Sequence, residues 1–402
     1  MKRQVLSSPR KRILLLVETS KSFGCKIIEG INQYSLEKGN WMLLLKDGSL
    51  NDLTSKMVGQ VPCDGIIARS TTKEMFAALR KTRVPTVELL GDGKTHRADI
   101  TTDRTKAGEM AFEHLHDRKL RHFGFFSLGH CWWSREVLDG YSRQCRKNAF
   151  PCHVCEMEKT VTTLPLPVQA DTRMEKTVAC WLEKLPKPIG ILCPEDGHAA
   201  FLANICIQNG LAVPFDTAVL GIGNNPTFCC NAAWPPLSSI VLNCTGIGYR
   251  AAKLLDDKMH ETDDVAQTQR IPPLYIAVRH STNFAAVVDE DVGRAIRFVS
   301  ENMGARCTLE QIAGYVGLSK RTLIRRFHSI FGHPPEQEIF LIRLNHAKEL
   351  LIETELSVKQ IAHSIGYRST DYFVRIFRQH VGITPLLFRQ QSKGLRLPKS
   401  DE

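Results

Sequence analysis

The sequence lacks an apolar run long enough to cross a membrane. Its longest uninterrupted apolar runs, such as Ile13–Val17 and Trp41–Leu45, have about five residues, whereas a membrane-spanning helix needs about 20. The basic start of the chain, Met1–Arg12, is not followed by the apolar core of roughly 7–15 residues that a secretory signal requires. We therefore expect a cytoplasmic protein with no membrane partner.

The sequence also lacks the cysteine spacing of a structural metal site. Its 13 cysteines are scattered, and the one Cys-x-x-Cys pair, Cys152 and Cys155, has no second pair at zinc-finger distance. In a chain without an export signal, scattered cysteines are typical of reduced, partly buried thiols. We expect no metal site.

Motifs of nucleotide cofactors and of hydrolytic catalysis are missing as well. No Gly-x-Gly-x-x-Gly follows an apolar run, because Gly221-Ile222-Gly223 stops after two glycines. Neither Gly-x-Ser-x-Gly, His-Glu-x-x-His nor a phosphate-binding loop occurs. The sequence therefore predicts no catalytic residue and no cofactor, and an α/β enzyme that acts on a sugar is kept as an alternative.

The formal charge of +11 is unevenly distributed along the chain. Residues 1–12 carry an excess of five cations, residues 290–402 carry another five, and the 277 residues between them carry only one. Basic regions of this kind attract polyanions. We expect an anionic polymer to bind the ends of the chain, the C-terminal end in particular.

Between Arg12 and about Arg279, short apolar runs alternate with longer amphipathic stretches. The runs of strand length are Ile13–Glu18, Trp41–Lys46, Gly65–Arg69, Thr86–Leu90, Phe123–Leu128, Ile189–Cys193 and Ala218–Ile222. The helical stretches include Lys26–Glu37, Lys73–Lys81, Thr105–Asp117, Met174–Leu185 and Ala199–Asn209. This alternation predicts parallel sheets with helices on both faces. In such a fold, ligands bind at the carboxyl ends of the strands.

The pattern changes after Ile271-Pro272-Pro273 and a last strand at Leu274–Val278. From Asp289 onward the sequence shows helical periodicity only. We therefore predict four segments along the chain. They are a basic arm (1–12), an α/β domain (13–285), an all-α domain (286–391) and a polar tail (392–402).

The all-α domain contains an internal repeat. The segment 312–319, IAGYVGLS, resembles the segment 361–368, IAHSIGYR. Further residue types recur at matched offsets, namely Phe327, Gly332 and Pro335 in the first copy and Phe377, Gly382 and Pro385 in the second.

Each copy is typical of a helix-turn-helix unit. A glycine, Gly317 or Gly366, supplies the turn, and the second helix carries an apolar pair four residues apart that packs on the first helix. The pairs are Leu323 with Phe327 and Phe373 with Phe377. The two units are predicted at about 308–331 and 357–380.

A single long helix is predicted between the two copies. Pro335 suits a first-turn position, and apolar residues recur at helical spacing through Glu338–Leu351. A helix of about 18 residues is about 27 Å long. Such a spacer could set the second helices of the two units about 34 Å apart, so that both enter successive major grooves on one face of B-DNA.

Residues 290–391 resemble the DNA-binding domain of AraC/XylS-type regulators. The motifs that carry this resemblance are Ile361-Ala362, Gly366-Tyr367, Tyr372-Phe373, Phe377-Arg378 and Gly382-Ile383-Thr384-Pro385. The preceding domain resembles the two-lobed, periplasmic-binding-protein-like sensor of lactose-repressor-type regulators. The segments concerned are 64–69 (DGIIAR), 121–125 (RHFGF), 133–136 (WSRE), 185–188 (LPKP) and 236–239 (PLSS).

The resemblance implies a sequence-specific transcriptional regulator. Its partners would be a double-stranded DNA operator, a small sugar (a pentose such as xylose), a second copy of the chain and RNA polymerase. It would control sugar-catabolic genes, as an activator or as a repressor. A non-specific architectural DNA-binding protein is the second alternative, although an acidic residue facing DNA, Asp371, argues against a purely non-specific coat.

By this resemblance, the second helix of each unit is a recognition helix. The residues expected to face base edges are Arg321, Ile324 and Arg325 in the first unit and Thr370, Asp371, Val374 and Arg375 in the second. Arginine can bind guanine in a bidentate manner, aspartate can accept from cytosine, and an aliphatic side chain can meet a thymine methyl. The residues expected to neutralise phosphates are Lys320, Arg326, Arg368 and Arg378.

Polar residues that follow the predicted strands are the candidates for sugar binding. They are Thr19, Ser20, Arg69, Asp103, Arg135, Glu195, Asp196 and Asn224, with Phe23, Trp132 and Trp133 as an aromatic floor. Charged, bidentate groups suit sugar hydroxyls, and an aromatic ring suits the sugar face. Sugar-responsive relatives usually carry an aspartate at the position of Gly223, and glycine offers no side chain to accept a hydroxyl hydrogen.

Overall fold

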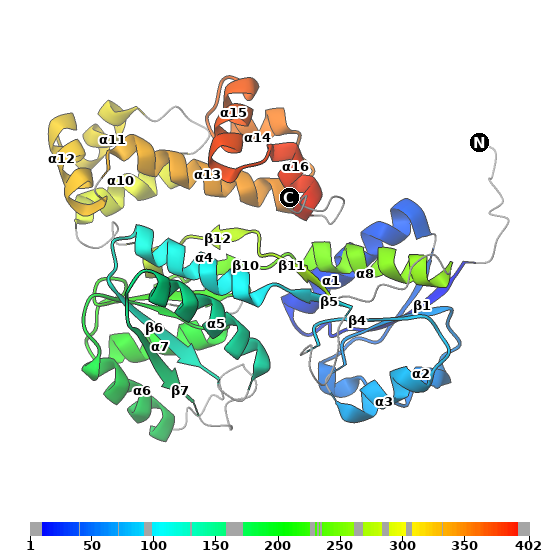
Figure 1. Cartoon of the computed structure of the whole chain (residues 1–402). Coiled ribbons are helices and arrows are strands. Elements are labelled where there is room, and N and C mark those ends of the chain that lie inside the picture. The colour runs from blue at the N-terminus through cyan, green and yellow to red at the C-terminus, as the bar shows by residue number, and fades with distance from the viewer. Residues whose placement is uncertain are drawn as a thin grey trace. The chain divides into compact units, whose positions relative to one another are not determined.

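The computed structural model describes most of the chain (Figure 1). The described residues are 10–39, 41–70, 72–91, 99–128, 131–157, 172–225, 230, 233, 235–260, 268–283, 289–302, 308–331 and 333–392. The greater part of the predicted arm, residues 1–9, lies outside the described residues. So does the predicted tail from residue 393 onward.

The chain divides into two compact units. The first unit comprises Met1–Asp103, Asn243–Pro272 and Gln390–Glu402. The second unit comprises Arg104–Leu242 and Pro273–Arg389. The α/β part of the chain therefore contributes to both units, and most of the all-α part lies in the second.

The first unit is built on a parallel sheet with the strand order β2-β1-β3-β4. Its strands are β1 (Arg12–Leu16), β2 (Met42–Leu45), β3 (Gly65–Ala68) and β4 (Thr86–Glu88). On one face, Leu14 and Ile66 are buried against Met75 and Leu79 of the helix α3 (Lys73–Lys81). A shorter parallel pair joins β5 (Ile100–Thr102) to β11 (Gln269–Ile271).

The other helical elements of the first unit include a closely packed pair. These elements are α1 (Ser22–Tyr34), η1 (Ser35–Gly39), η2 (Leu50–Asp52), α2 (Met57–Gln60) and α8 (Cys244–Met259). In α8, a Cβ at Gly248 would collide with the backbone carbonyl of Ile27 in α1. Glycine at this position therefore allows α1 and α8 to approach at backbone distance.

The second unit is built on a sheet with the strand order β12-β10-β9-β8-β6-β7. Its strands are β6 (His122–Ser127), β7 (Cys152–Glu156), β8 (Ile189–Leu192), β9 (Thr217–Ile222), β10 (Ser238–Val241) and β12 (Tyr275–Ala277). Neighbouring strands run parallel, except that β12 is antiparallel to β10. The central strands β8, β9 and β10 are buried along their whole length, as expected for a sheet between helical layers, whereas the edge strand β7 is partly exposed.

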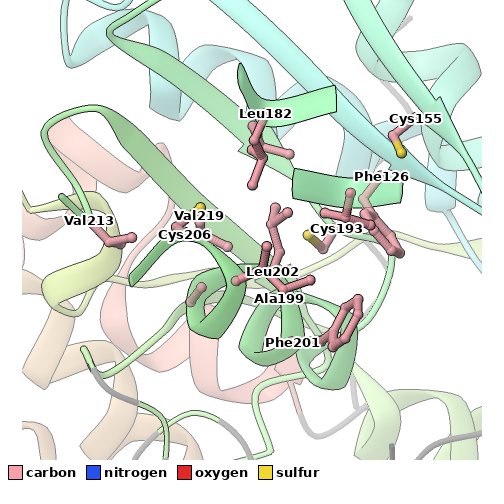
Figure 2. Close-up of a cluster of buried hydrophobic side chains, with 14 of the residues drawn as sticks. Phe126, Cys155, Leu182, Cys193, Ala199, Phe201, Leu202, Cys206, Val213 and Val219 are labelled. Atoms are coloured by element: carbon pink, nitrogen blue, oxygen red, sulfur yellow. The ribbon is translucent and has the colours of Figure 1, made fainter. Parts of the chain in front are cut away.

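Helices cover both faces of this sheet. They are α4 (Arg104–Asp117), α5 (Trp132–Lys147), α6 (Thr172–Lys184) and α7 (Asp196–Gln208), followed later in the chain by the 3-10 turn η4 (His280–Thr282). Adjacent residues of β6 point to opposite faces, so Phe125 packs with Tyr141 of α5 and Phe126 packs with Leu202 of α7. Figure 2 shows the second of these clusters, in which side chains of α7 lie against the sheet.

The Cys-x-x-Cys pair lies on β7. Cys155 belongs to the cluster shown in Figure 2, whereas Cys152 packs against the cluster on the opposite face. Residues three apart on a strand point to opposite sides. These two thiols therefore cannot bind one metal ion together unless the backbone of β7 is distorted.

The all-α part consists of short helices around one longer helix. They are α10 (Glu290–Glu301), α11 (Leu309–Val316), α12 (Lys320–Phe331), α13 (Pro335–Glu353), α14 (Val358–Ser364), α15 (Thr370–Val381) and α16 (Pro385–Ser392). The helices α11 and α14 begin with matching capping boxes, Thr308 with Gln311 and Ser357 with Gln360. The turn glycines, Gly317 and Gly366, have φ angles of 77° and 86°, which disfavour other residue types.

The predicted fold class, parallel α/β sheets followed by a helical region with two helix-turn-helix units, is confirmed. Each of the seven predicted apolar runs overlaps a strand of the structure, and three of these strands begin one residue earlier than predicted. The strands that the sequence analysis did not identify are β5, β7, β10 and β11. Two of them, β5 and β11, are mostly polar and have only 3 residues each, and half of the residues of β10 are polar. Hydrophobicity and length therefore do not distinguish these three strands.

Candidate functional site

The first helix-turn-helix unit presents α12 with one buried and one exposed side. Ser319 caps the helix by accepting a hydrogen bond from the N–H of Thr322 (3.1 Å). Leu323 and Phe327 are buried against α10 and α11, which confirms the predicted packing of the apolar pair. Arg321 and Arg325 are exposed, and Ile324 is half-buried between them. The three predicted base-facing residues thus lie on or next to the exposed side.

Two cations predicted to contact phosphate are engaged within the protein. Lys320 forms an ion pair of 2.7 Å with Glu310 on the surface. Arg326 donates to both carboxylate oxygens of Asp289 (2.8 and 2.9 Å) and to Asp291 (2.9 Å). Because its guanidinium holds the start of α10 against α12, Arg326 is left out of the DNA interface that we propose below.

The second unit presents α15 in the same way. Phe373 and Phe377 are buried against Ile361, Ala362 and Ile365, as predicted, and Ser369 caps the helix through the N–H of Tyr372 (3.2 Å). Arg368 is exposed just before the helix, and Thr370 is half-buried at its start.

Four of the residues predicted for DNA binding line one open hollow on α15. The hollow has a volume of about 580 Å³ and is lined by Asp371, Val374, Arg375, Arg378, Gln379, Gly382 and Thr384. The Arg375 guanidinium lies 5.3 Å from the ring of Tyr372, which is itself exposed. The sequence analysis missed Tyr372, Gln379 and Thr384, although the helical spacing of Tyr372 and Gln379 relative to Arg375 could have identified them.

The helix α13 connects the two helix-turn-helix units. It has 19 residues, one more than the expected length, and it is therefore about 28 Å long. Ile339 near its start packs with the buried core of the first unit, and Leu344, Ala347 and Leu351 belong to that of the second. The helix is consequently part of both cores.

In the first unit of the chain, candidate sugar-binding residues meet at the carboxyl ends of β1 and β3. These two strands are neighbours, and the chain order reverses between them, which is where ligands bind in open α/β sheets. Arg69 follows β3 and forms an ion pair with Glu18, which follows β1. The Arg69 guanidinium also lies 5.6 Å from the ring centre of Phe23. Ser20, two residues after Glu18 in the sequence, is exposed.

Glu18 is a candidate that the sequence analysis missed. Only 1% of its surface is exposed. One carboxylate oxygen accepts from Arg69, and the other, Oε2, is buried and has no hydrogen-bond partner among the described residues. A buried carboxylate oxygen without a donor is unfavourable, and a hydroxyl of a ligand would satisfy it. Its place directly after an apolar run was the sequence signal.

In the second unit of the chain, the strand order reverses between β6 and β8. Trp133 and Arg135 follow β6, and Glu195 follows β8. Burial raises the pKa of the Cys131 thiol to about 11, Glu195 adds to this rise, and Arg135 opposes it. Both charges therefore lie near Cys131. Trp133 packs against the core cluster of α7.

Further aromatic and polar candidates lie at nearby chain positions. The Arg104 guanidinium lies 4.7 Å from the ring centre of Trp132, and Arg104, like Glu18, is a sugar-site candidate that the sequence analysis missed. Asp103 follows β5 in the first unit of the chain, and its N–H donates to the carbonyl of Ile271 (2.7 Å). Thr19 donates its hydroxyl to Asp47.

Asp196 and Asn224 are engaged with residues of their own unit. The Asp196 carboxylate accepts from the Ser239 hydroxyl and from the N–H of Asn225 (2.8 Å). Burial raises the pKa of Asp196, and these hydrogen bonds oppose the rise. The side-chain oxygen of Asn224 accepts from Arg279 (2.8 Å). Both residues therefore hold the loop after β9 in place, and no single-sequence signal pointed to Ser239 or Arg279.

Gly223 lies within this loop at a φ angle of +122°, a conformation that residues other than glycine rarely adopt. A Cβ at this position would lie 3.3 Å from Oδ2 of Asp196. An aspartate here, as in the usual family pattern, would place a second carboxylate beside a buried one. The local backbone and charge thus both suit glycine.

No cluster of three or more His, Cys, Asp or Glu side chains suited to a metal ion occurs in the described part of the chain. No described helix is both long and apolar enough to traverse a lipid bilayer.

Three family models match successive parts of the chain. They are the XylR N-terminal domain over residues 12–100, the periplasmic binding protein-like domain over residues 112–282 and a helix-turn-helix domain over residues 312–391. The family resemblance expected from the motifs is confirmed by these matches.

Two relatives match over nearly the whole chain. The xylose operon regulatory protein of Haemophilus influenzae is 29% identical over 390 residues, which cover 94% of this chain and 98% of that protein. The xylose operon regulatory protein of Escherichia coli K12 is 27% identical over 406 residues, which cover 96% and 99%. Both are named as regulators.

One solved structure also matches at this coverage. It is that of the xylose-binding transcription activator xylR, with a TM-score of 0.57 and 26% sequence identity over 95% of this chain and 98% of that one. The order of domains in this chain is thus shared with proteins of known architecture.

Proposed function

We propose that this chain is a transcriptional regulator that binds an operator in double-stranded DNA and responds to a small sugar. It is a homologue of the xylose operon regulatory proteins and carries an AraC-type helix-turn-helix domain. It acts in the cytoplasm as a homodimer and controls sugar-catabolic genes, with RNA polymerase as a further partner.

The observation that carries the DNA-binding part is the matched exposure of two recognition helices. Each unit buries its apolar pair and leaves arginines exposed on the opposite side, Arg321 and Arg325 on α12 and Arg375 and Arg378 on α15. Exposed arginines with aliphatic and acidic neighbours can distinguish base pairs in the major groove. Lys320, Arg368 and Arg378 supply phosphate contacts.

The sugar-binding part rests on two sets of residues at the carboxyl ends of strands. In the first unit of the chain the set is Glu18, Ser20, Phe23 and Arg69, and in the second it is Trp133, Arg135 and Glu195. The buried Oε2 of Glu18 has no donor in the part of the chain that the structure describes, and it suits a sugar hydroxyl. Xylose is the first sugar to test because one relative is named for binding it.

The proposed mechanism is a shift between two states of the dimer. The sugar stabilises the state that it binds more tightly, and that state presents the DNA-binding helices in a different arrangement. The shift can be no larger than the difference in sugar affinity between the two states.

Selection of DNA from a random-sequence pool with the full-length chain tests the DNA-binding part. We expect a defined sequence with two protected segments about one helical turn apart. Equal binding to all sequences would contradict this proposal and favour an architectural DNA-binding protein.

A thermal-shift screen tests the sugar-binding part. We expect D-xylose, or another of L-arabinose, D-ribose and D-glucose, to raise the melting temperature by mass action. Arg69→Met should abolish the shift, whereas Arg83→Met, which replaces an exposed arginine of the same unit, should keep it. No shift with any sugar would contradict sugar binding, and turnover of a sugar would favour the enzyme.

A further inference from the structure

A series of hydrogen-bonded polar side chains, called the polar chain below, crosses the second compact unit of the protein (residues 104–242 and 273–389). It begins at the carboxyl end of β8, where the Asp196 carboxylate accepts from the Ser239 hydroxyl. The oxygen of that hydroxyl accepts from the N–H of Asn224 (2.9 Å), and the side-chain oxygen of Asn224 accepts from Nη2 of Arg279 (2.8 Å). The polar chain therefore starts in the loop that contains Gly223.

The polar chain continues through β10 and η4. The Ser238 hydroxyl accepts from the N–H of Arg279 (2.8 Å) and donates to the carbonyl of the same residue (3.0 Å). It also accepts from the hydroxyl of Thr282 (2.7 Å). Thr282 contacts Nε2 of His114 (3.0 Å), and Nδ1 of His114 contacts Nη1 of Arg118 (3.0 Å).

The direction of these hydrogen bonds is determined by chemistry. Arginine only donates, so Nδ1 of His114 accepts from Arg118, and the proton of the neutral ring is on Nε2. Nε2 then donates to Thr282, Thr282 donates to Ser238, and Ser238 donates to a carbonyl. Burial and the Arg118 charge both lower the pKa of His114, which is consistent with a neutral ring.

The polar chain ends at Arg118, whose charge interacts with Glu338 of α13. Nε of Arg118 donates to the carbonyl of Thr282 (2.7 Å). Burial lowers the pKa of Arg118 to about 10, and the Glu338 carboxylate in the first turn of α13 opposes this shift. Arg118 in turn opposes the rise that burial imposes on the pKa of Glu338. Glu338 also pairs with His333 at 3.5 Å.

An apolar contact also links α13 to the sheet of this unit. Tyr275 and Ala277 of β12 belong to the same buried cluster as Leu344, Ala347 and Leu351 of α13, and α13 runs along β12 (Figure 1). The helix thus covers the edge strand of the sheet. Since α13 is part of both helix-turn-helix cores, a change in its position on β12 would affect the positions of both recognition helices.

We propose that the polar chain from Asp196 and Asn224 to Arg118 and Glu338 couples the sugar-binding end of the second unit to the position of α13. This inference rests on the function proposed above and assigns the residues that transmit the signal.

The polar chain suits this role because its links depend on one another. Each hydroxyl has one proton and already donates it, so rotation of one group leaves a buried neighbour unpaired, which is unfavourable. A sugar that moves the 223–225 loop would therefore favour a different set of hydrogen bonds as far as Arg118. Energetic coupling between the two ends is the physical test of such a connection.

A double-mutant cycle on the full-length chain measures this coupling. The probe is the DNA duplex that the wild-type chain selects from a random pool, and no sugar is needed. Asn224→Gly removes the side chain at a position whose φ angle of 49° glycine tolerates, and Glu338→Gln removes the charge at the far end. We expect each change to alter the Kd for the duplex by about fivefold or more, and the double variant to resemble one single variant rather than the product of the two.

Two further variants complete the experiment. Thr282→Val interrupts the middle of the polar chain and should reproduce the effect of Asn224→Gly. It replaces Asn224→Gly in the cycle if circular dichroism shows that Asn224→Gly is unstable. Glu113→Gln makes the same change as Glu338→Gln at an exposed position of α4 and should leave the Kd unchanged.

The outcomes separate this inference from the proposed function. The coupling would be overturned if the two single changes in Kd multiply in the double variant, or if the single variants leave the Kd unchanged as Glu113→Gln does. DNA recognition would stand in both cases. A wild-type chain that selects no sequence would overturn the proposed function, and the coupling with it.

Discussion

Arg325 and Arg326 are adjacent in the sequence, but they lie on different sides of α12. Successive residues of a helix are about 100° apart around its axis, so Arg325 is exposed while Arg326 is turned toward Asp289 and Asp291. At the scale of single residues, a cation can therefore be assigned to DNA or to the fold only when its partners are known.

Arg325→Ala should weaken binding to the selected duplex by about 1–3 kcal/mol and relax the preference at one base pair, because a bidentate contact with guanine is lost. Titrations with the selected duplex and with single-base variants of it measure both effects. Arg143→Ala, an exposed arginine on α5, is the matched control. An equal loss on the selected duplex and on random DNA would indicate a phosphate contact instead.

Gly223→Asp should lower the free energy of unfolding by more than Gly223→Ala does. Both variants require an unfavourable φ angle, which costs about 1–3 kcal/mol, but only aspartate adds a carboxylate next to the buried Asp196. The two carboxylates should repel each other at pH 7. Denaturant unfolding of the two variants compares them, and an equal loss of stability would show that the charge is unimportant.

At the scale of elements, α13 has two functions with different chemical requirements. Its apolar residues complete the cores of both helix-turn-helix units and cover the edge strand β12. Its polar residues are also partly covered as a result, and Lys348 lies 5.9 Å from the ring centre of Tyr275. A long helix that serves several neighbours thus buries a cation that an isolated helix would leave in water.

Lys348→Met should raise the free energy of unfolding at pH 7 by about 1–2 kcal/mol, because the buried ammonium is unfavourable. Burial lowers the pKa of Lys348 from 10.5 to about 8. The folded chain therefore binds this proton more weakly than the unfolded chain, so the cost is complete below about pH 8 and disappears as the pH rises toward 10.5. Thermal unfolding at pH 7 and pH 9.5 should show a smaller difference between variant and wild type at the higher pH.

Lys359→Met is the control for this prediction because Lys359 is exposed on α14. We expect it to change the melting temperature by little at either pH. A difference between Lys348→Met and wild type that is constant with pH would show that packing, not charge, causes the stabilisation.

At the scale of the whole molecule, we expect DNA binding to depend on the spacing of the two proposed recognition helices, which one stiff helix sets. A helix of about 28 Å that is part of both cores cannot lengthen to follow a changed site. This rigidity distinguishes the chain from two helix-turn-helix units on a flexible linker, which would tolerate different spacings.

Insertion of 5 base pairs between the two half-sites of the selected duplex should weaken binding by about tenfold or more, since it turns the second half-site to the opposite face of the DNA. The same insertion outside the site is the control and should have no effect. Footprinting and titration of the three duplexes measure the result. Equal affinity for all three would contradict the rigid-spacer arrangement.

The sequence by itself determined the types of the elements and the internal repeat. Apolar runs such as Ile13–Val17 and the recurring Leu323/Phe327 and Phe373/Phe377 pairs depend on contacts between residues near in the chain, and their period is visible in one sequence. The expectation that sugar-binding residues lie at the carboxyl ends of strands follows in the same way from strand order in α/β sheets.

Only the tertiary structure decided which polar groups meet. Arg326 pairs with Asp289, Glu18 with Arg69, and Asp196 with Ser239, over separations of 37, 51 and 43 residues. Arg118 directly follows α4, and its charge interacts with Glu338 of α13, which is 220 residues away in the sequence. Such pairs have no period, because each depends on how distant elements pack and on the need of every buried charge for a partner.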